Sequence, residues 1–407
     1  MATGLAEIII LGLIVDWLLR QVRVPGLIGM MLVGVLLGPF VFDALDPALL
    51  DIGADLRLIA LIVILLRAGF ALSRDVLHRI GGRVLLLAFI PATCEGVMIT
   101  LVARHLLGLT LLESALLGSV IAAVSPAVIV PAMLRFIEQR KGEEKSIPAM
   151  IMAACSVDDI YVIVAHAVLL GLYVGQDMNI VWQVAGIPVS LLLGTVAGLG
   201  LGVGLCRLFM KYNPRATKRV LVLIAVAVLL VRLEHLLAGL VPFAGLVAAM
   251  AIGFMILERN ETMAHEIAAK LAKIWVFAEI ILFSMVGAQV NIAVAWETGL
   301  AGAAVIGLGM LARATGVWTC LLGSPLTLRE RSFCVLAFSP KATVQAAIGA
   351  SPLLAMQASS LSTRPGEIIL ATAVLSIILT APFGAWAVNA VGNRVLKALP
   401  PDARRHQ

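Results

Sequence analysis

Two adjacent carboxylates, Asp158 and Asp159, lie inside an apolar stretch of this 407-residue chain. The residues around them, 152–166, read Met-Ala-Ala-Cys-Ser-Val-Asp-Asp-Ile-Tyr-Val-Ile-Val-Ala-His. A carboxylate at the centre of a bilayer costs roughly 2.5 kcal/mol or more, so such groups usually face a protein interior or a wet cavity and carry function. Neighbouring helix positions point about 100° apart, so both acids can face one place from different directions. We expect this pair to bind and release a cation or a proton; an interhelical hydrogen-bonding pair is the structural alternative.

A lysine, Lys341, lies in a second apolar stretch directly after Ser339-Pro340. A buried ammonium needs a partner, because desolvation disfavours its charged form. We expect it to pair with Asp158, which leaves Asp159 as the carboxylate where H⁺ and a metal cation compete. The alternative is a helix-end lysine whose amine reaches water.

Opposite charges also occur at Glu95 and Arg313, in matching parts of the two halves of the chain. We expect them to form a second buried ion pair. The sequence favours neither of two roles for this pair, fixing the geometry of the helices or taking part in proton coupling. His166 lies seven residues after Asp159 and is assigned a structural role. The remaining charges within apolar stretches are assigned to packing or to a vestibule: Asp16, Arg67 and Glu279.

These residues must be positioned by membrane helices. Hydrophobic residues make up 61% of the chain and charged residues 13%, and the mean hydropathy is +1.06, far from a soluble domain. Stretches of about 20 apolar residues suit a hydrocarbon core of ~30 Å, and backbone in lipid favours helices. The prediction is therefore an all-α polytopic membrane protein, and the five cysteines are packing residues. Thirteen spans are predicted: 5–20, 24–41, 55–73, 83–107, 111–136, 146–172, 180–207, 218–239, 240–257, 272–290, 299–322, 331–351 and 367–393.

The distribution of positive charge gives an orientation for these spans. With thirteen spans, 23 of the 30 lysines and arginines lie in loops and span ends on one side. Cytoplasmic loops carry such an excess, so we expect the N-terminus outside and the C-terminus in the cytoplasm of a bacterial inner membrane. The net charge of +6 then faces anionic lipid, and no nucleic-acid partner is needed to explain it.

The chain contains an internal repeat. The segment from Pro25 resembles the segment from Pro242, 217 residues later, and Ser125-Pro126 resembles Ser339-Pro340, 214 residues later. Each pair is seven spans apart, so the copies are inverted across the membrane, as in many secondary transporters. A proline inside a helix removes a hydrogen bond, so we expect both Ser-Pro helices to unwind and expose carbonyls, with a second break at Pro131; a plain kink is the alternative. The predicted lining residues are Ser125, Pro126, Ser339, Pro340 and Thr343.

Three segments together resemble a known family. They are Ala122-Ala-Val-Ser-Pro-Ala-Val-Ile-Val-Pro131, Met152–Ile160 and Ser339-Pro-Lys-Ala-Thr-Val-Gln-Ala-Ala-Ile-Gly349. They resemble the NHA-type sodium/proton exchangers of the cation/proton antiporter superfamily, over nearly the whole chain.

The resemblance implies Na⁺ (or Li⁺) exchange for H⁺ without a cofactor, with Asp159 as the principal ligand and Asp158 beside it. It also implies Lys341 paired with Asp158, and Glu95 with Arg313 as an accessory pair. A homodimer with elevator-like alternating access is implied too. Within one transporter unit of 1–407, the expected parts are a dimerisation part near 1–73 and 218–290, an ion-translocating core near 83–172 and 299–393, and a linking helix at 180–207.

Other functions remain open at this stage. The same fold can move K⁺ against H⁺, or an organic anion. An intramembrane aspartyl protease also uses two membrane aspartates, but it draws them from two helices, whereas Asp158 and Asp159 share one. The expected protein is therefore a transporter and not an enzyme; the proton stoichiometry and the choice among Na⁺, Li⁺ and K⁺ do not follow from the sequence.

Overall fold

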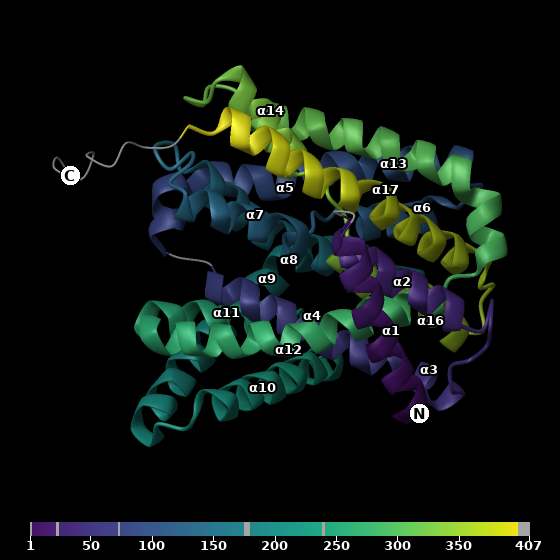
Figure 1. The fold of residues 1–407 in the computed structure, drawn as a ribbon, viewed down its shortest axis with the longest axis horizontal. Coiled ribbons are helices and arrows are strands. Elements are labelled where there is room, and N and C mark those ends of the chain that lie inside the picture. Colours follow the sequence, from purple (N-terminus) through teal and green to yellow (C-terminus); the bar gives the residue numbers. More distant parts are fainter. Residues whose placement is uncertain (1, 22–23, 72–73, 175–179, 238–240, 398–407) are drawn as a thin grey trace. The chain divides into compact units, whose positions relative to one another are not determined.

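The protein is all-helical throughout the part that the structure describes. A computed structural model describes residues 2–21, 24–71, 74–174, 180–237 and 241–397, and no strand occurs among them (Figure 1). Eight helices in these ranges are long and apolar enough to cross a membrane. The predicted all-α class is confirmed, since a chain in lipid must satisfy its backbone groups within each helix.

Each predicted span corresponds to a continuous or broken helix in the described ranges, although the number that cross the membrane stays a prediction. The predicted boundaries at 73, 239 and 240 lie outside the described residues. The largest difference is at α12, which begins at Glu261 and not at residue 272. Asn260 caps this helix, because its side chain accepts from the Met263 N–H at 2.9 Å, so the helix starts in polar sequence before the apolar run.

The chain divides into two compact units. Unit 1 comprises Met1–Arg74, Val164–Ile292 and Ala350–Thr363, and unit 2 comprises Asp75–Ile163, Ala293–Gly349 and Arg364–Gln407. The long helix α8 (Ile147–Tyr173) contributes its first part to unit 2 and its last part to unit 1. The dimerisation, linking and translocating roles expected from the sequence stay predictions.

Unit 1 is built on close helix packing. Its helix α9 (Ile180–Tyr212) packs on α11 (Gly245–Arg259) through Gly194, Gly198 and Gly202, one per turn; a Cβ on Gly198 would lie 2.3 Å from the Ala248 carbonyl oxygen. Small residues at this spacing let membrane helices approach closely. Its other helices are α1 (Ala2–Gln21), α2 (Gly26–Leu37), α3 (Pro47–Asp51), α4 (Gly53–Ala71), α10 (Ala216–Leu237), α12 (Glu261–Ala288) and α16 (Ser351–Ala358).

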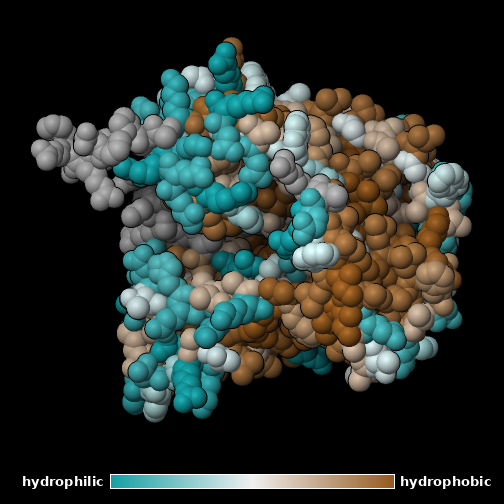
Figure 2. Space-filling model, viewed as in Figure 1, coloured by the Kyte–Doolittle hydropathy of each residue, from teal (hydrophilic) through white to brown (hydrophobic). Residues whose placement is uncertain are grey.

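The outer face of α1 in unit 1 is strongly apolar. Figure 2 shows hydrophobic side chains gathered over α1 and α2. Such a surface suits lipid or another apolar surface, because it would be unfavourable in water. The exposed apolar side chains of α1 include Ile10, Leu11, Leu13, Ile14, Trp17 and Leu18.

Unit 2 contains the helices that carry the predicted site. Phe136 and Phe333 meet edge to face, with ring centroids 6.1 Å apart, inside its apolar core. Its helices are α5 (Arg74–Leu106), α6 (Leu111–Ile121), α7 (Pro126–Glu138), the first part of α8, α13 (Ile292–Cys320), α14 (Leu328–Ala337), α15 (Thr343–Ile348) and α17 (Arg364–Val395).

The repeat is visible in how equivalent helices begin. Helices α6 and α14 both start with a capping box, Thr110 with Glu113 and Thr327 with Glu330. In each box the threonine hydroxyl accepts from the glutamate N–H and the glutamate carboxylate accepts from the threonine N–H. These boxes are 217 residues apart, and so are the first residues of α7 and α15. The offset of 214 inferred from the two Ser-Pro pairs was therefore wrong by three residues. Pro126 is the first residue of α7, whereas Pro340 lies in extended chain before α15.

Both predicted helix breaks are present. Residues 122–125 separate α6 from α7, and residues 338–342 separate α14 from α15. The additional break predicted at Pro131 was wrong, because α7 runs continuously from Pro126 to Glu138. Pro131 costs this helix one hydrogen bond, and packing inside a membrane protein tolerates that loss. A further interruption at residues 349–350 divides α15 from α16 and was not predicted.

Candidate ion-binding site

The two interrupted helices of unit 2 cross at their extended segments. The Ser125 N–H donates to the Pro340 carbonyl at 2.9 Å, which joins one break to the other. The hydroxyls of Ser125 and Thr343 are 3.2 Å apart, and the Thr343 N–H donates to Ser125 Oγ at 3.3 Å. Of the predicted lining residues, Ser125, Pro340 and Thr343 thus meet, whereas the Ser339 hydroxyl bonds the Leu336 carbonyl of its own helix.

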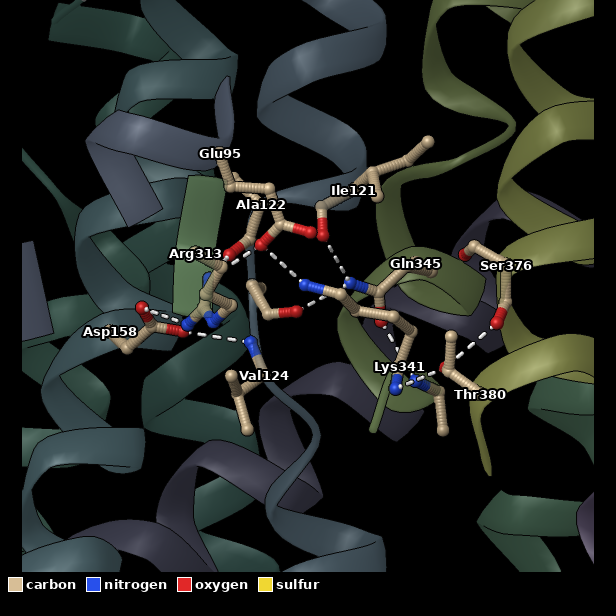
Figure 3. Close-up of polar contacts among 12 residues, drawn as sticks. Glu95, Ile121, Ala122, Val124, Asp158, Arg313, Lys341, Gln345, Ser376 and Thr380 are labelled. Atoms are coloured by element: carbon tan, nitrogen blue, oxygen red, sulfur yellow. Dashed lines mark hydrogen bonds and ion pairs between the residues drawn. The ribbon is translucent and has the colours of Figure 1, made fainter. Parts of the chain in front are cut away.

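Buried ion pairs surround this crossing (Figure 3). Glu95 Oε2 accepts from Arg313 Nη1 at 2.7 Å and from Lys341 Nζ at 2.6 Å. Arg313 Nη2 donates to Asp158 Oδ1 at 2.8 Å, and the Val124 N–H donates to Asp158 Oδ2 at 2.8 Å. All four charged side chains are at most 2% exposed, so each charge depends on its partners rather than on water.

The pairing differs in one respect from the sequence prediction. The expected Glu95–Arg313 pair is formed, but Lys341 bonds Glu95 and not Asp158. The planar guanidinium of Arg313 accounts for the difference, because its two arms reach Glu95 and Asp158 together. Lys341 then takes the remaining contact on Glu95, and the predicted Lys341–Asp158 pair was wrong.

Asp159 differs from its neighbour. Its side chain is 3% exposed, and within the described residues it makes no hydrogen bond or ion pair; its Oδ1 is a buried oxygen without a partner. A buried unpaired carboxylate is costly unless a cation or a proton neutralises it. Asp158 is held by two donors, whereas Asp159 is free to bind.

The charges around the crossing do not balance. Glu95, Asp158 and Asp159 are three acids, and Arg313 and Lys341 are two bases, so one negative charge is left over when all are ionised. Glu95, Asp158, Arg313 and Lys341 form a closed set of ion pairs. The surplus charge therefore belongs to Asp159, which one monovalent cation or one proton can neutralise.

The backbone carbonyls of the first break accept hydrogen bonds from Arg313 and from Gln345, a residue that the sequence prediction missed. Gln345 Nε2 donates to the Ile121 carbonyl at 3.2 Å and the Ala123 carbonyl at 2.8 Å, and Arg313 bonds the Ala122 carbonyl between them. Each of these three carbonyls therefore already accepts a side-chain hydrogen bond, whereas the sequence predicted that the first break would expose its carbonyls to the ion. An amide in the apolar run Val344–Ile348 was the available signal for Gln345.

A second missed residue, Thr380 on α17, supports the other break. Its Oγ1 accepts from the Lys341 N–H at 2.8 Å and donates to the Ser376 carbonyl at 2.8 Å. Val124 and Lys341 are 217 residues apart and are therefore equivalent in the repeat. The Val124 N–H donates to the Asp158 carboxylate on α8, and the Lys341 N–H donates to the Thr380 hydroxyl on α17.

The other charged candidates belong to unit 1. Asp16 pairs with Arg20 at 2.7 Å, and the Arg67 guanidinium lies 5.6 Å from the ring centroid of Trp275. His166 is buried and its Nε2 lies 2.7 Å from Ser351 Oγ, as a structural histidine would.

Comparison with known proteins identifies the family to which the chain belongs. A family model described as "Sodium/hydrogen exchanger, transmembrane" matches residues 8–389. Human sodium/hydrogen exchanger 9B2 is 31% identical over 384 residues, which cover 92% of this chain and 70% of that protein. The Xenopus tropicalis protein of the same name is 32% identical over 359 residues, covering 84% of this chain and 64% of its own length. Human sodium/hydrogen exchanger 9B1 is 27% identical over 384 residues, covering 91% and 72%.

The fold also matches a solved structure. The sodium proton antiporter MjNhaP1 from Methanocaldococcus jannaschii superposes with a TM-score of 0.83 at 21% identity, covering 96% of this chain and 97% of that one. The protease and organic-anion alternatives are set aside by these matches. The chain belongs to the sodium/hydrogen exchanger family of the cation/proton antiporter superfamily, and it is an integral membrane transporter that exchanges a cation for protons.

Proposed function

We propose that the protein exchanges Na⁺ or Li⁺ for H⁺, with the cation and the proton competing for Asp159. The observation that carries this proposal is the unpartnered, buried Asp159 carboxylate beside an Asp158 that Arg313 and the Val124 N–H already hold. Because either a cation or a proton removes the cost of the unpaired charge, binding of one excludes the other. The hydroxyls of Ser125 and Thr343, which lie 3.2 Å apart at the crossing, are the neutral oxygen ligands that we propose for the cation.

The charge balance around Asp159 supports a stoichiometry of one proton per cation. Asp158 and Lys341 are each held in the closed set of ion pairs, so neither needs to release a proton during the cycle. Exchange of one monovalent cation for one proton moves no net charge. Release of a second proton from Lys341 would make the exchange electrogenic instead.

The test is a transport assay in everted vesicles with an imposed pH gradient and a pH-sensitive dye. We expect Na⁺ and Li⁺ to dequench the dye, K⁺ to have little effect, and the rate to be the same with and without a clamped membrane potential. Dequenching by K⁺ alone would favour the K⁺/H⁺ alternative. A rate that depends on the potential would overturn the one-to-one stoichiometry and leave the ion assignment standing.

We further propose elevator-like alternating access, in which unit 2 carries the site. Support comes from the location of the residues: Glu95, Ser125, Asp159, Arg313 and Lys341 all belong to unit 2. A unit that contains the whole site and its ion pairs can move as a body without breaking them. Unit 1 would then be the scaffold against which it moves, and the apolar face of α1 offers that scaffold a dimer contact.

The proposed assembly and orientation have simple checks. A homodimer in detergent should have twice the 42.9 kDa protein mass of one chain. The lysine and arginine distribution supports an outside N-terminus and a cytoplasmic C-terminus; a C-terminal tag should then be cut by protease in everted vesicles and protected in right-side-out ones. A bacterial inner membrane stays a prediction from the sequence, since the relatives named above are animal proteins.

A further inference from the structure

Gln345 connects the two broken helices through both ends of its amide. The residue is fully buried on the short helix α15. Its Nε2 donates to the carbonyls of Ile121 and Ala123 in the first break, and its Oε1 accepts from the Ala342 N–H in the second break at 2.8 Å. The opposite amide orientation would place its oxygen against two carbonyls and its nitrogen against an N–H, so the donor and acceptor roles are set by the surroundings.

These hydrogen bonds fix the positions of the backbone oxygens at the crossing. The Ile121 and Ala123 carbonyls are occupied by Gln345, and the Ala122 carbonyl by Arg313. The Pro340 carbonyl accepts from the Ser125 N–H. The hydroxyls of Ser125 and Thr343 also lie at the crossing, one from each broken helix and 3.2 Å apart. Their spacing depends on how firmly the two breaks are held together.

We propose that Gln345 is a positioning residue that sets the spacing of the crossing and thereby the discrimination between Li⁺ and Na⁺. This inference rests on the proposed cation site at Asp159. Selectivity among alkali cations depends on the number and the placement of oxygen ligands. The Gln345 hydrogen bonds join the two breaks and limit how far the oxygen ligands can shift. Without these bonds, the ligands can adjust to ions of either size, so the affinities for Li⁺ and Na⁺ become more equal.

Two substitutions separate the functions of the amide. Gln345→Met has a similar shape and makes none of the hydrogen bonds. Gln345→Glu retains an acceptor for the Ala342 N–H, but when ionised it has no donor for the carbonyls of Ile121 and Ala123. Its protonated form regains one donor, so its defect should shrink as the pH falls, whereas the defect of Gln345→Met should not.

The readout is the ratio of the apparent KM values for Li⁺ and Na⁺ in vesicles. One net hydrogen bond is worth about 1 kcal/mol, so we expect this ratio to change about fivefold in both variants at alkaline pH. The control is Thr298→Val on α13, which removes a buried hydroxyl that, within the part of the chain that the structure describes, bonds only the Val294 carbonyl of its own helix. Its ratio should equal that of the wild type.

Several outcomes would overturn the inference. One is a ratio within about twofold of the wild type in both Gln345 variants, well below the effect of one hydrogen bond. Another is failure of both variants to fold while Thr298→Val folds, which would make the residue structural. If the wild-type protein showed no Na⁺- or Li⁺-dependent exchange, the proposed function itself would fail, and that result is recognised before any variant is compared.

Discussion

Asp159→Asn should abolish cation-dependent proton movement in everted vesicles and leave the protein folded. The amide cannot release a proton at physiological pH, and it offers a cation no negative charge. The substitution also removes a buried charge that has no partner in the described structure, so the melting temperature should stay the same or rise. A loss of transport together with an unchanged or higher melting temperature is the signature of a binding residue and not of a structural one.

The matched control is another membrane-embedded acid. Asp16 lies in unit 1 and pairs with Arg20, so Asp16→Asn should retain cation-dependent exchange. Transport by Asp159→Asn at a rate close to the wild type would assign the competing site to another residue. Equal loss in both variants would show that removing any embedded carboxylate impairs the protein.

The helices and their breaks follow from local properties of the sequence. Apolar runs of membrane-spanning length predicted where helices lie, and Ser125-Pro126 and Ser339-Pro340 predicted two interruptions, because proline removes a backbone donor. The same rule failed at Pro131, where α7 continues. Whether a proline breaks a helix depends on the packing around it, and a single sequence contains no direct record of that packing.

The composition of the site was also predictable, but its pairing was not. Asp158, Asp159, Lys341, Glu95 and Arg313 stand out as charges in apolar sequence, and all five are buried in unit 2. Which base meets which acid depends on distances of a few ångström between helices that are remote in sequence. Here the Arg313 guanidinium contacts both Glu95 and Asp158, and Lys341 pairs with Glu95.

Residues that bond the backbone were the hardest to foresee. Gln345 and Thr380 are uncharged, and a threonine in a membrane helix commonly bonds its own helix, as Thr380 also does through the Ser376 carbonyl. Their importance comes from unpaired N–H and carbonyl groups at breaks in other helices. Such groups are visible only once the crossing is assembled.

Glu95→Gln should cause a large loss of stability. Glu95 Oε2 is the shared acceptor of Arg313 and Lys341, and all three side chains are at most 2% exposed. Removing the charge leaves Arg313 with Asp158, but it leaves the Lys341 ammonium without an ion-pair partner in the described structure. Breaking a buried ion pair in this way costs about 3–5 kcal/mol, which thermal unfolding in detergent should register as a clear drop in melting temperature.

The double variant Glu95→Gln/Lys341→Met tests whether the uncompensated ammonium is the cause. Lys341→Met alone should be milder, because Glu95 keeps Arg313 as its partner. Adding it to Glu95→Gln removes the stranded charge, so the double variant should be more stable than Glu95→Gln alone. A double-mutant cycle for residues in contact should then give a coupling energy of about 0.5–3 kcal/mol. Additive losses would mean that Lys341 finds another counter-charge when Glu95 is removed, and Asp158 or Asp159 would be the acid to substitute next.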